Sequence, residues 1–299
     1  MKKNKNLLVV TGGCGFIGSQ LINLLLLKTK YNIISLDNYS SGTKKNQIKN
    51  KRVKYLTGDT KNIKNILNIY SSKIHSLFHF GEFSRIYQSF LQMSKCMDSN
   101  GTGTIQVFNF CLQNKIKLIY SATSASLGNK GKDKNLSPYS FSKTKNLELL
   151  ENLKKWFNFK YEVIFFYNVY GPGQIKTGDM ATVIGIFEDH FLKNKPLPVV
   201  LPGTQSRRFT HIDDTINACY LAWKKNKCKF YSVSNRESLS ILELAKLFRS
   251  KIKYLPFRKG ERYISSLTKE VFSNQIYRIY GKKSIKDYVL NFIKKHGKI

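Results

Sequence analysis

Short apolar runs recur along the first half of the chain, and longer segments with helical spacing of apolar residues lie between them. The run at residues 7–10 is apolar throughout, which is typical of a strand buried on both faces of a parallel sheet. The runs that we interpret as strands lie at residues 7–10, 32–36, 53–56, 77–81 and 118–120. Strands that alternate with helices at this spacing predict an α/β fold with a doubly wound parallel sheet, whose site lies along the carboxyl ends of the strands.

Three spaced glycines, Gly12, Gly15 and Gly18, follow the first predicted strand, and an apolar helical segment continues from residue 20. In such a loop the first glycine permits a tight turn, the second lets a pyrophosphate approach the backbone, and the third packs the helix on the strand. The unpaired N–H groups and the positive dipole end of the helix then face the phosphates. A structural turn is the alternative for a glycine triplet alone, but the strand before it and the helix after it favour a dinucleotide site.

Asp37 ends the second predicted strand, about 20 residues beyond the glycine loop. A carboxylate at this place can accept both hydroxyls of a ribose and would repel a 2′-phosphate, which favours NAD over NADP. The alternative for Asp37 is a turn or cap residue. Asp59 and Thr60 come just past the third strand, where an adenine would lie, whereas His79 in the fourth strand is predicted to be a packed core histidine.

Small and hydroxylated residues mark two further places in the pattern. The helical segment at residues 95–115 is interrupted by small residues at 100–104, which indicates close approach of a cofactor or of another helix. The fifth strand delivers the serine- and threonine-rich residues 121–128 to the carboxyl edge of the sheet. We therefore expect hydroxyl groups at the site.

Tyr139 and Lys143 open the next helix, and their spacing of four places both on one face of it. An ordinary tyrosine titrates near ~10, so a phenol that acts as a base near pH 7 needs about 4 kcal/mol of help. One cation about 4 Å away supplies roughly that amount at an effective dielectric constant near 20. A surface pair is the alternative, and the glycine loop and the hydroxyl-rich strand end favour the catalytic interpretation.

Composition limits the class of protein. The chain of 299 residues, 41% hydrophobic and 13% aromatic, can bury a full core and hold one large domain or two. No apolar stretch approaches the ~18 residues of a membrane span, and the first residues do not resemble a signal peptide, so we expect a cytoplasmic enzyme. Five cysteines without a Cys-x-x-Cys pair argue against a disulfide framework and against a zinc site, and we expect no metal.

The formal net charge of +33 raises the question of a nucleic-acid partner. The lysines are scattered through every segment, however, and no aromatic–basic RNA motif or zinc-finger spacing accompanies them. We interpret the excess as compositional bias on solvated faces, with no nucleic acid and no membrane as partner. Such a field would also attract an anionic substrate.

Five motifs in chain order carry a resemblance to a known superfamily. They are TGGCGFIG at residues 11–18, DNYSSG at 37–42, SAT at 121–123, YSFSK at 139–143 and NVYGP at 168–172. Together they resemble the extended short-chain dehydrogenase/reductase superfamily, and more narrowly its NAD-dependent nucleotide-sugar epimerases and dehydratases, with a UDP-hexose 4-epimerase-like pattern. The match runs from residue 7 to about residue 285.

The resemblance implies a Rossmann-type fold with a smaller, discontinuous C-terminal substrate domain. It implies NAD as the cofactor and a nucleoside-diphosphate sugar, with a UDP-sugar favoured, as the substrate. The NAD-binding domain would comprise residues 1–168 and about 208–232, and the sugar-nucleotide domain about 169–207 and 233–299. Helices around 95–113 and 140–156 correspond to a two-fold interface in this family, so we expect a homodimer.

The resemblance also assigns roles. Tyr139 would be the general base that takes a proton from the sugar hydroxyl, and Lys143 would hold the nicotinamide ribose and lower the pKa of the phenol. Thr123 would hydrogen-bond the reacting oxygen and relay its proton. The residues predicted to contact the cofactor are Gly12, Gly15, Phe16, Ile17, Gly18, Asp37, Asn38, Ser40, Ser41, Gly42, Asp59, Thr60, Phe80, Gly81, Asn100, Ser121, Tyr139, Lys143 and Tyr167.

The second half of the chain resembles the substrate half of the family. Arg207 matches an arginine that grips the diphosphate, and Arg258 lies in a segment that resembles a second such loop, whereas His211, Asp213 and Asp214 are predicted to be structural. The residues predicted to contact the substrate are Ser84, Thr123, Asn168, Thr182, Val183, Val199, Arg207, Arg258 and Ser265. A small residue at 265 would leave room for an N-acyl group on the sugar.

The reaction expected from this resemblance is the 4-epimerisation of a nucleotide sugar, of the UDP-glucose or UDP-N-acetylglucosamine type, by transient oxidation at C4. A 4,6-dehydratase or a 4-keto reductase is the alternative within enzymes, and a catalytically silent NAD-binding regulator is the alternative outside them. Dehydratases of the family carry an acidic pair after the catalytic threonine, but Ser124 and Ala125 stand here. Leu127, Phe165 and Gly173 also depart from the usual residues at the nicotinamide pocket and the substrate edge.

Overall fold

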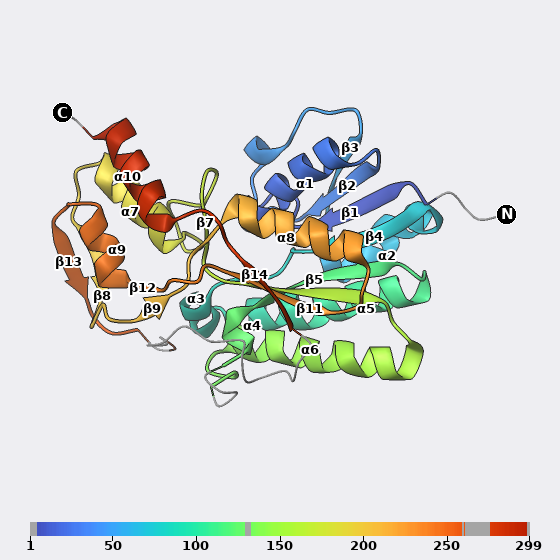
Figure 1. The fold of residues 1–299 in the computed structure, drawn as a ribbon. Coiled ribbons are helices and arrows are strands. Elements are labelled where there is room, and N and C mark those ends of the chain that lie inside the picture. The colour runs from blue at the N-terminus through green and yellow to red at the C-terminus, as the bar shows by residue number, and fades with distance from the viewer. Residues whose placement is uncertain (1–4, 129–132, 259, 261–275, 298–299) are drawn as a thin grey trace.

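A parallel sheet of eight strands forms the centre of the computed structural model, which describes residues 5–128, 133–258, 260 and 276–297 (Figure 1). The strands run in the order β14-β11-β6-β5-β4-β1-β2-β3, and every neighbouring pair is parallel. Their bounds are β1 Leu7–Thr11, β2 Asn32–Asp37, β3 Val53–Thr57, β4 Ile74–His79, β5 Lys117–Thr123, β6 Tyr161–Phe166, β11 Phe230–Ser234 and β14 Ile276–Tyr280. The predicted fold class and the five predicted strands are confirmed, although β4 begins three residues earlier than the apolar run indicates.

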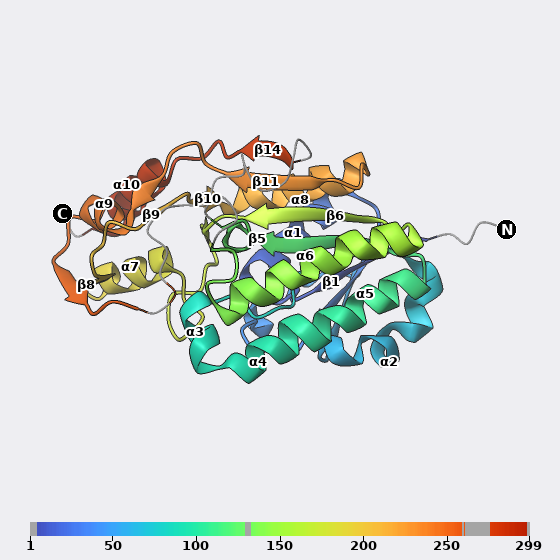
Figure 2. The same ribbon diagram turned by 90° about the horizontal axis from the view of Figure 1, so that it is seen from below.

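Helices cover both faces of the sheet, as Figures 1 and 2 show. On one face α1 (Phe16–Lys28) and α8 (Ile212–Lys225) pack against an apolar cluster that includes Val10 and Phe78. On the other face lie α2 (Ile63–Leu67), α5 (Thr104–Gln113) and α6 (Pro138–Phe157), whose buried residues join a cluster around Tyr120. The helices α3 (Ile86–Leu91) and α4 (Met93–Met97) and the 3-10 turns Lys44–Asn46, Thr60–Asn62, Asn68–Lys73 and Ser124–Ser126 complete this part.

A smaller apolar core lies beyond the carboxyl ends of the strands, at the left of Figure 1. Its elements are β7 Val169–Tyr170, α7 Val183–Leu192, β8 Leu197–Val200, β9 Ser206–Arg207, β10 Thr210–His211, β12 Leu239–Ser240, α9 Ile241–Leu247, β13 Ile252–Leu255 and α10 Ile285–His296. Phe187 and Phe248 are among its buried residues. The domain boundaries stay a prediction, but β14, from the segment assigned to the sugar-nucleotide domain, returns to the edge of the central sheet.

The predicted interruption of the helix at residues 95–115 is present as a π-helical turn, Asp98–Gly103, between α4 and α5. A Cβ atom on Gly103 would lie 2.5 Å from the Thr60 hydroxyl, so the small residue allows a close approach of the segment after β3. Among the described residues, no helix is long and apolar enough to cross a membrane.

Candidate active site

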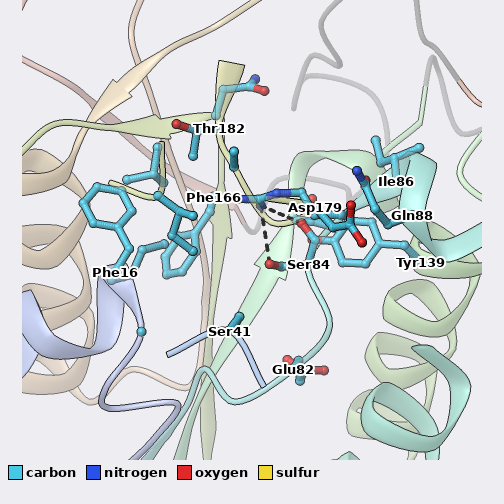
Figure 3. Close-up of a pocket in the computed structure, with 18 of the residues that line it drawn as sticks. Phe16, Ser41, Glu82, Ser84, Ile86, Gln88, Tyr139, Phe166, Asp179 and Thr182 are labelled. Atoms are coloured by element: carbon cyan, nitrogen blue, oxygen red, sulfur yellow. Dashed lines mark hydrogen bonds between the residues drawn. The ribbon is translucent and has the colours of Figure 1, made fainter. Parts of the chain in front are cut away.

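A cavity of about 780 Å³ opens at the carboxyl ends of the central strands, where the smaller core faces the sheet. Residues of the glycine loop, β2, β5, α6, α7, β8 and β9 line it. Figure 3 shows Tyr139 together with Ile86, Gln88 and Asp179 on one side of the cavity and Phe16 on the other. The cavity therefore joins the predicted cofactor residues and the predicted substrate residues in one space.

The glycine loop has the close approaches that a dinucleotide cradle needs. Gly12 adopts φ +67°, and a Cβ atom there would lie 2.8 Å from the backbone of Phe80 and Gly81. A Cβ atom on Gly18 would lie 2.1 Å from the Gly12 carbonyl, so only glycine lets α1 pack on the loop. The loop and the first turn of α1 line the cavity, so their N–H groups fit a pyrophosphate.

Asp37 both shapes the loops and lines the cavity. One carboxylate oxygen accepts the Cys14 N–H at 2.8 Å, and the other accepts the Tyr39 N–H at 2.8 Å. The turn role and the cofactor role are therefore compatible, since each oxygen keeps a second lone pair for a hydroxyl. The buried carboxylate at this strand end fits a ribose without a 2′-phosphate.

Tyr139, Lys143 and Thr123, which the resemblance groups as catalytic residues, lie around one cavity. Ser137 caps α6 in a reciprocal capping box with Ser140, which fixes the first turn of the helix and thereby Tyr139. Thr123 ends β5 and hydrogen-bonds Tyr139, and the Lys143 ammonium donates to the Ser121 carbonyl at 2.6 Å. All three predicted catalytic side chains line the cavity.

The ionisation of Tyr139 differs from the expectation. Burial raises the pKa of Tyr139 to about 12, against the lowering effect of its hydrogen bond to Thr123. The Glu82 carboxylate raises this pKa further, whereas the nearby Arg85 lowers it. The physical reason is that burial of the phenol disfavours its charged form, and the Glu82 carboxylate, which pairs with Lys143, adds to this effect.

Glu82 is a site residue that sequence reasoning missed. Its carboxylate pairs with Lys143 and accepts hydrogen bonds from Thr104 and Tyr120, each at 3.0 Å. Its side chain is 2% exposed and still lines the cavity. The one available signal was an acidic residue directly after Gly81, among apolar neighbours at the end of the fourth strand.

His79 connects the glycine loop to this carboxylate. Its Nδ1 lies 2.7 Å from the Thr11 hydroxyl, and its Nε2 lies 3.0 Å from the Thr104 hydroxyl. Thr11 accepts the N–H groups of Phe80 and Gly81, so its hydrogen is available to His79, whose Nε2–H then donates to Thr104. Burial lowers the pKa of His79 to about 4, so the ring is neutral near pH 7, as a core histidine should be.

The structure separates the remaining predicted residues into two groups. The predicted cofactor and substrate residues that line the cavity are Gly12, Gly15, Phe16, Ile17, Gly18, Asp37, Asn38, Ser40, Ser41, Thr60, Phe80, Gly81, Ser84, Ser121, Asn168, Thr182, Val183, Arg207 and Arg258. Those described but outside its lining are Gly42, Asp59, Asn100, Tyr167 and Val199. Ser265 lies outside the described residues.

Asn100, a predicted cofactor contact, is buried beside the cavity. Its side-chain oxygen accepts the Phe83 N–H at 2.7 Å, and its amide donates to the Phe83 carbonyl at 3.0 Å and to the Ser142 hydroxyl at 3.2 Å. The side chain is fully buried and does not line the cavity, so it holds the segment after β4 in place. His211 caps α8 at the junction with β10, in agreement with the predicted structural role.

Arg85 is a second residue that the sequence did not single out. It lines the cavity, and its guanidinium donates to the carbonyls of Ser84, at 2.9 Å, and Met180. Its Nε is buried without a hydrogen-bond partner among the described residues. It adds a cation to the substrate end, where Arg207 and Arg258 also lie.

Comparison with known proteins agrees with the site. Residues 8–233 match the model of the NAD dependent epimerase/dehydratase family. The chain is 26% identical to a candidate UDP-glucose 4-epimerase of Methanocaldococcus jannaschii, over 92% of this chain and 89% of that protein. It is 27% identical to the ADP-L-glycero-D-manno-heptose-6-epimerase of Brachyspira hyodysenteriae, over 84% of each.

Among solved structures, the fold is similar to that of the UDP-glucose 4-epimerase of Thermotoga maritima. The TM-score is 0.83 at 23% identity, over 97% of this chain and 99% of the other. The family match covers the glycine loop, Asp37 and the catalytic trio together. The chain belongs to the NAD-dependent epimerase/dehydratase family and is an NAD-dependent enzyme of the nucleotide-sugar epimerase type.

Proposed function

We propose that this protein is a nucleoside-diphosphate-sugar 4-epimerase that acts on a UDP-sugar. The observation that carries the proposal is that Thr123, Tyr139 and Lys143 line the same cavity as the glycine loop and as Arg207 and Arg258. These predicted cofactor residues and predicted substrate residues therefore lie around one space. The two arginines are suited to the diphosphate, because their charge and forked N–H groups match phosphate oxygens.

The residues that would hold NAD are the glycine loop, Asp37 and Lys143. Bound there, NAD would supply a reversible two-electron acceptor at C4 of the sugar. Tyr139 takes the proton from the C4 hydroxyl, and Thr123 hydrogen-bonds the same oxygen and keeps it oriented. When the sugar has turned in the site, Tyr139 returns the proton to the C4 oxygen. Because the hydride would also return to C4 from NAD bound there, the enzyme needs no external oxidant.

The high pKa of Tyr139 gives this proposal a clear requirement. A base near pH 7 needs positive charge close to the phenolate. Arg85 supplies such a charge, and Lys143, four residues further along α6, lines the same cavity. Ser124 and Ala125 line the cavity where a dehydratase needs an acidic pair, which supports epimerisation over loss of water.

The test is incubation of the purified protein with UDP-, GDP- and ADP-sugars, without added cofactor and with product analysis by chromatography. One epimer pair should interconvert, most rapidly as the UDP-sugar, and Tyr139→Phe should abolish the interconversion. No turnover with any sugar, despite bound NAD, would contradict the proposal and favour a silent regulator. Steady consumption of NAD(P)H with a keto sugar would instead indicate a reductase.

We also propose that the enzyme is a homodimer that pairs through α5 and α6, which lie side by side on one face of the sheet (Figure 2). Exposed apolar side chains on these helices, Ile105, Phe141 and Trp156, support the proposal. Light scattering at micromolar concentration should give twice the mass of the chain, and a monomer mass would contradict it.

A further inference from the structure

Lys143 is a buried cation with a small set of partners. Its side chain is 4% exposed, and its ammonium donates to the Glu82 carboxylate and to the Ser121 carbonyl. The ammonium also lies 4.7 Å from the centroid of the Tyr120 ring. A buried ammonium is stable only where an anion or an aromatic face replaces its lost hydration. Within the described part of the chain, Glu82 is the one carboxylate that pairs with Lys143.

Glu82 is itself held in one position. Thr104 on α5 and Tyr120 on β5 donate to one of its oxygens, and Lys143 on α6 binds the other. Since these partners belong to three different elements, the carboxylate cannot rotate away without losing bonds to all of them. The hydrogen-bond chain through His79 supports the same position from the side of the glycine loop.

We propose that Glu82 is a positioning residue for the reaction: its carboxylate keeps the Lys143 ammonium charged and fixed at the edge of the cavity. Two of the three N–H groups of Lys143 are used by Glu82 and Ser121, which leaves the third for a ligand hydroxyl. This inference deepens the proposed function and rests on it for the turnover measurements, but not for the binding measurement below.

The effect of Glu82 on Lys143 can be separated from the effects of the other titratable groups nearby. Besides Glu82, the titratable side chains that face this charge are His79, Cys96, Tyr120 and Tyr139. Burial lowers the pKa of His79 to about 4, and burial raises the pKa of Cys96 to about 11 and that of Tyr139 to about 12. Burial also raises the pKa of Tyr120 well above its ordinary value. In the protein without bound nucleotide, these four groups therefore keep one protonation state between pH 7 and pH 9.5.

The protonation of Lys143, in contrast, depends on Glu82. Burial lowers its pKa, and the Glu82 carboxylate acts in the opposite direction. Glu82→Gln keeps the size and one acceptor oxygen but removes the charge. Without the carboxylate, a buried lysine titrates several units below its ordinary value of ~10.4. The ammonium would then lose its proton within the range in which the enzyme is assayed.

Binding of NAD to the full chain, freed of nucleotide, is the first test, because Lys143 is expected to donate to the nicotinamide ribose. Calorimetry at pH 7.0 and pH 9.5 should give the parent protein the same Kd within about threefold. For Glu82→Gln the Kd should rise by at least about tenfold between the two pH values, since the neutral lysine donates weakly. An equal pH dependence for both proteins would overturn the proposal.

A matched control is Glu162→Gln, which removes a second carboxylate that forms a buried pair with a lysine. Glu162 lies outside the cavity, so its variant should follow the parent at both pH values. If Glu162→Gln also shows the alkaline loss of binding, the effect reflects general destabilisation and the proposal fails.

Turnover is the second test, with Glu82→Asp as the conservative variant that folds if Glu82→Gln does not. Aspartate keeps the charge but is one methylene shorter, so kcat should fall at least about tenfold while KM for the sugar stays within about threefold. The alkaline limb of kcat should stay at the parent pH in Glu82→Asp and move to lower pH in Glu82→Gln. Parent kcat in Glu82→Asp would overturn the proposal, whereas failure of the parent to turn over any sugar contradicts only the proposed function.

Discussion

Two buried lysine–glutamate pairs lie at opposite edges of the central sheet. Lys117 and Glu162 sit at the amino ends of β5 and β6, with N–O 2.9 Å and side chains 9% and 0% exposed. Lys143 and Glu82 lie at the carboxyl edge, with side chains 4% and 2% exposed. The chemical groups and the burial are the same, and only the second pair lines the cavity.

The surroundings distinguish the two pairs. Glu162 accepts the backbone N–H groups of Cys228 and Lys229, and Lys117 donates to the Trp223 carbonyl. That pair therefore joins β5 and β6 to the end of α8 and the start of β11. Glu82 instead accepts side-chain hydroxyls, and Lys143 keeps a donor free for a ligand. A buried ion pair that is bound to backbone groups stabilises the fold. A buried ion pair that is bound to hydroxyl groups beside a cavity can take part in ligand binding and catalysis.

The largest effect is expected from removing each lysine in turn. Lys143→Met should lower turnover by at least about 10²-fold, because the cavity then lacks the cation that is expected to hold the nicotinamide ribose beside the base. Lys117→Met should leave kcat within about twofold of the parent. Steady-state assays on both variants measure the difference, and an equal loss of activity in the two would contradict the distinction between the pairs.

The Lys117→Met variant should also be less stable than the parent protein. Lys117→Met leaves the Glu162 carboxylate buried without its cation, which should cost about 3 kcal/mol of unfolding free energy. Urea denaturation measures this loss. The double variant Lys117→Met with Glu162→Leu should recover part of it, since no charge is then buried, but not all, because two backbone N–H groups lose their acceptor. A double variant less stable than the single one would be evidence against this account.

Acid should lower the free energy of unfolding, because His79 is buried in its neutral form. The unfolded chain protonates a histidine near pH ~6.5, whereas the folded chain holds His79 neutral down to about pH 4. Stability is therefore complete above about pH 6.5 and falls by about 3 kcal/mol as the pH drops toward 4. Urea denaturation at pH 7.5, 6 and 5 measures the slope, which should be smaller in His79→Gln. The same slope in both proteins would assign the acid sensitivity to other groups.

The comparison also shows what the sequence can predict. Gly12, Gly18, Asp37 and the catalytic helix were visible because each depends on neighbours a few residues away or on the end of a strand. The sheet followed from the alternation of apolar runs for the same reason. The pairing of Glu82 depends on Lys143, 61 residues further on, and therefore on the packing of α6 against the sheet.

Tertiary packing also decided the role of Asn100 and the ionisation of Tyr139. The motif position of Asn100 indicated a cofactor contact, but its amide is used by the Phe83 backbone. The spacing of Tyr139 and Lys143 indicated a lowered pKa for the phenol, but the Glu82 carboxylate, unseen in that pattern, acts on both. Local spacing predicts which groups meet, while the net charge around them depends on segments that the fold brings in from elsewhere.

The smallest expected effect is on stability, and it comes from removing the tyrosine hydroxyl that lies beside each of the two glutamates. Tyr120 donates to Glu82 at 3.0 Å, so Tyr120→Phe should cost about 1–2 kcal/mol of stability and lower kcat less than about tenfold. The buried Tyr231 hydroxyl lies near Glu162, which raises its pKa, but among the described residues it makes no hydrogen bond of regular geometry, so Tyr231→Phe should cost less stability than Tyr120→Phe. Urea denaturation and kcat of the two variants test the pair of expectations, because each change removes one buried phenolic oxygen from the same sheet. If Tyr231→Phe lost as much stability as Tyr120→Phe, the hydroxyl of Tyr231 would have a partner, and the amino-edge pair would resemble the catalytic one more closely than its backbone contacts indicate.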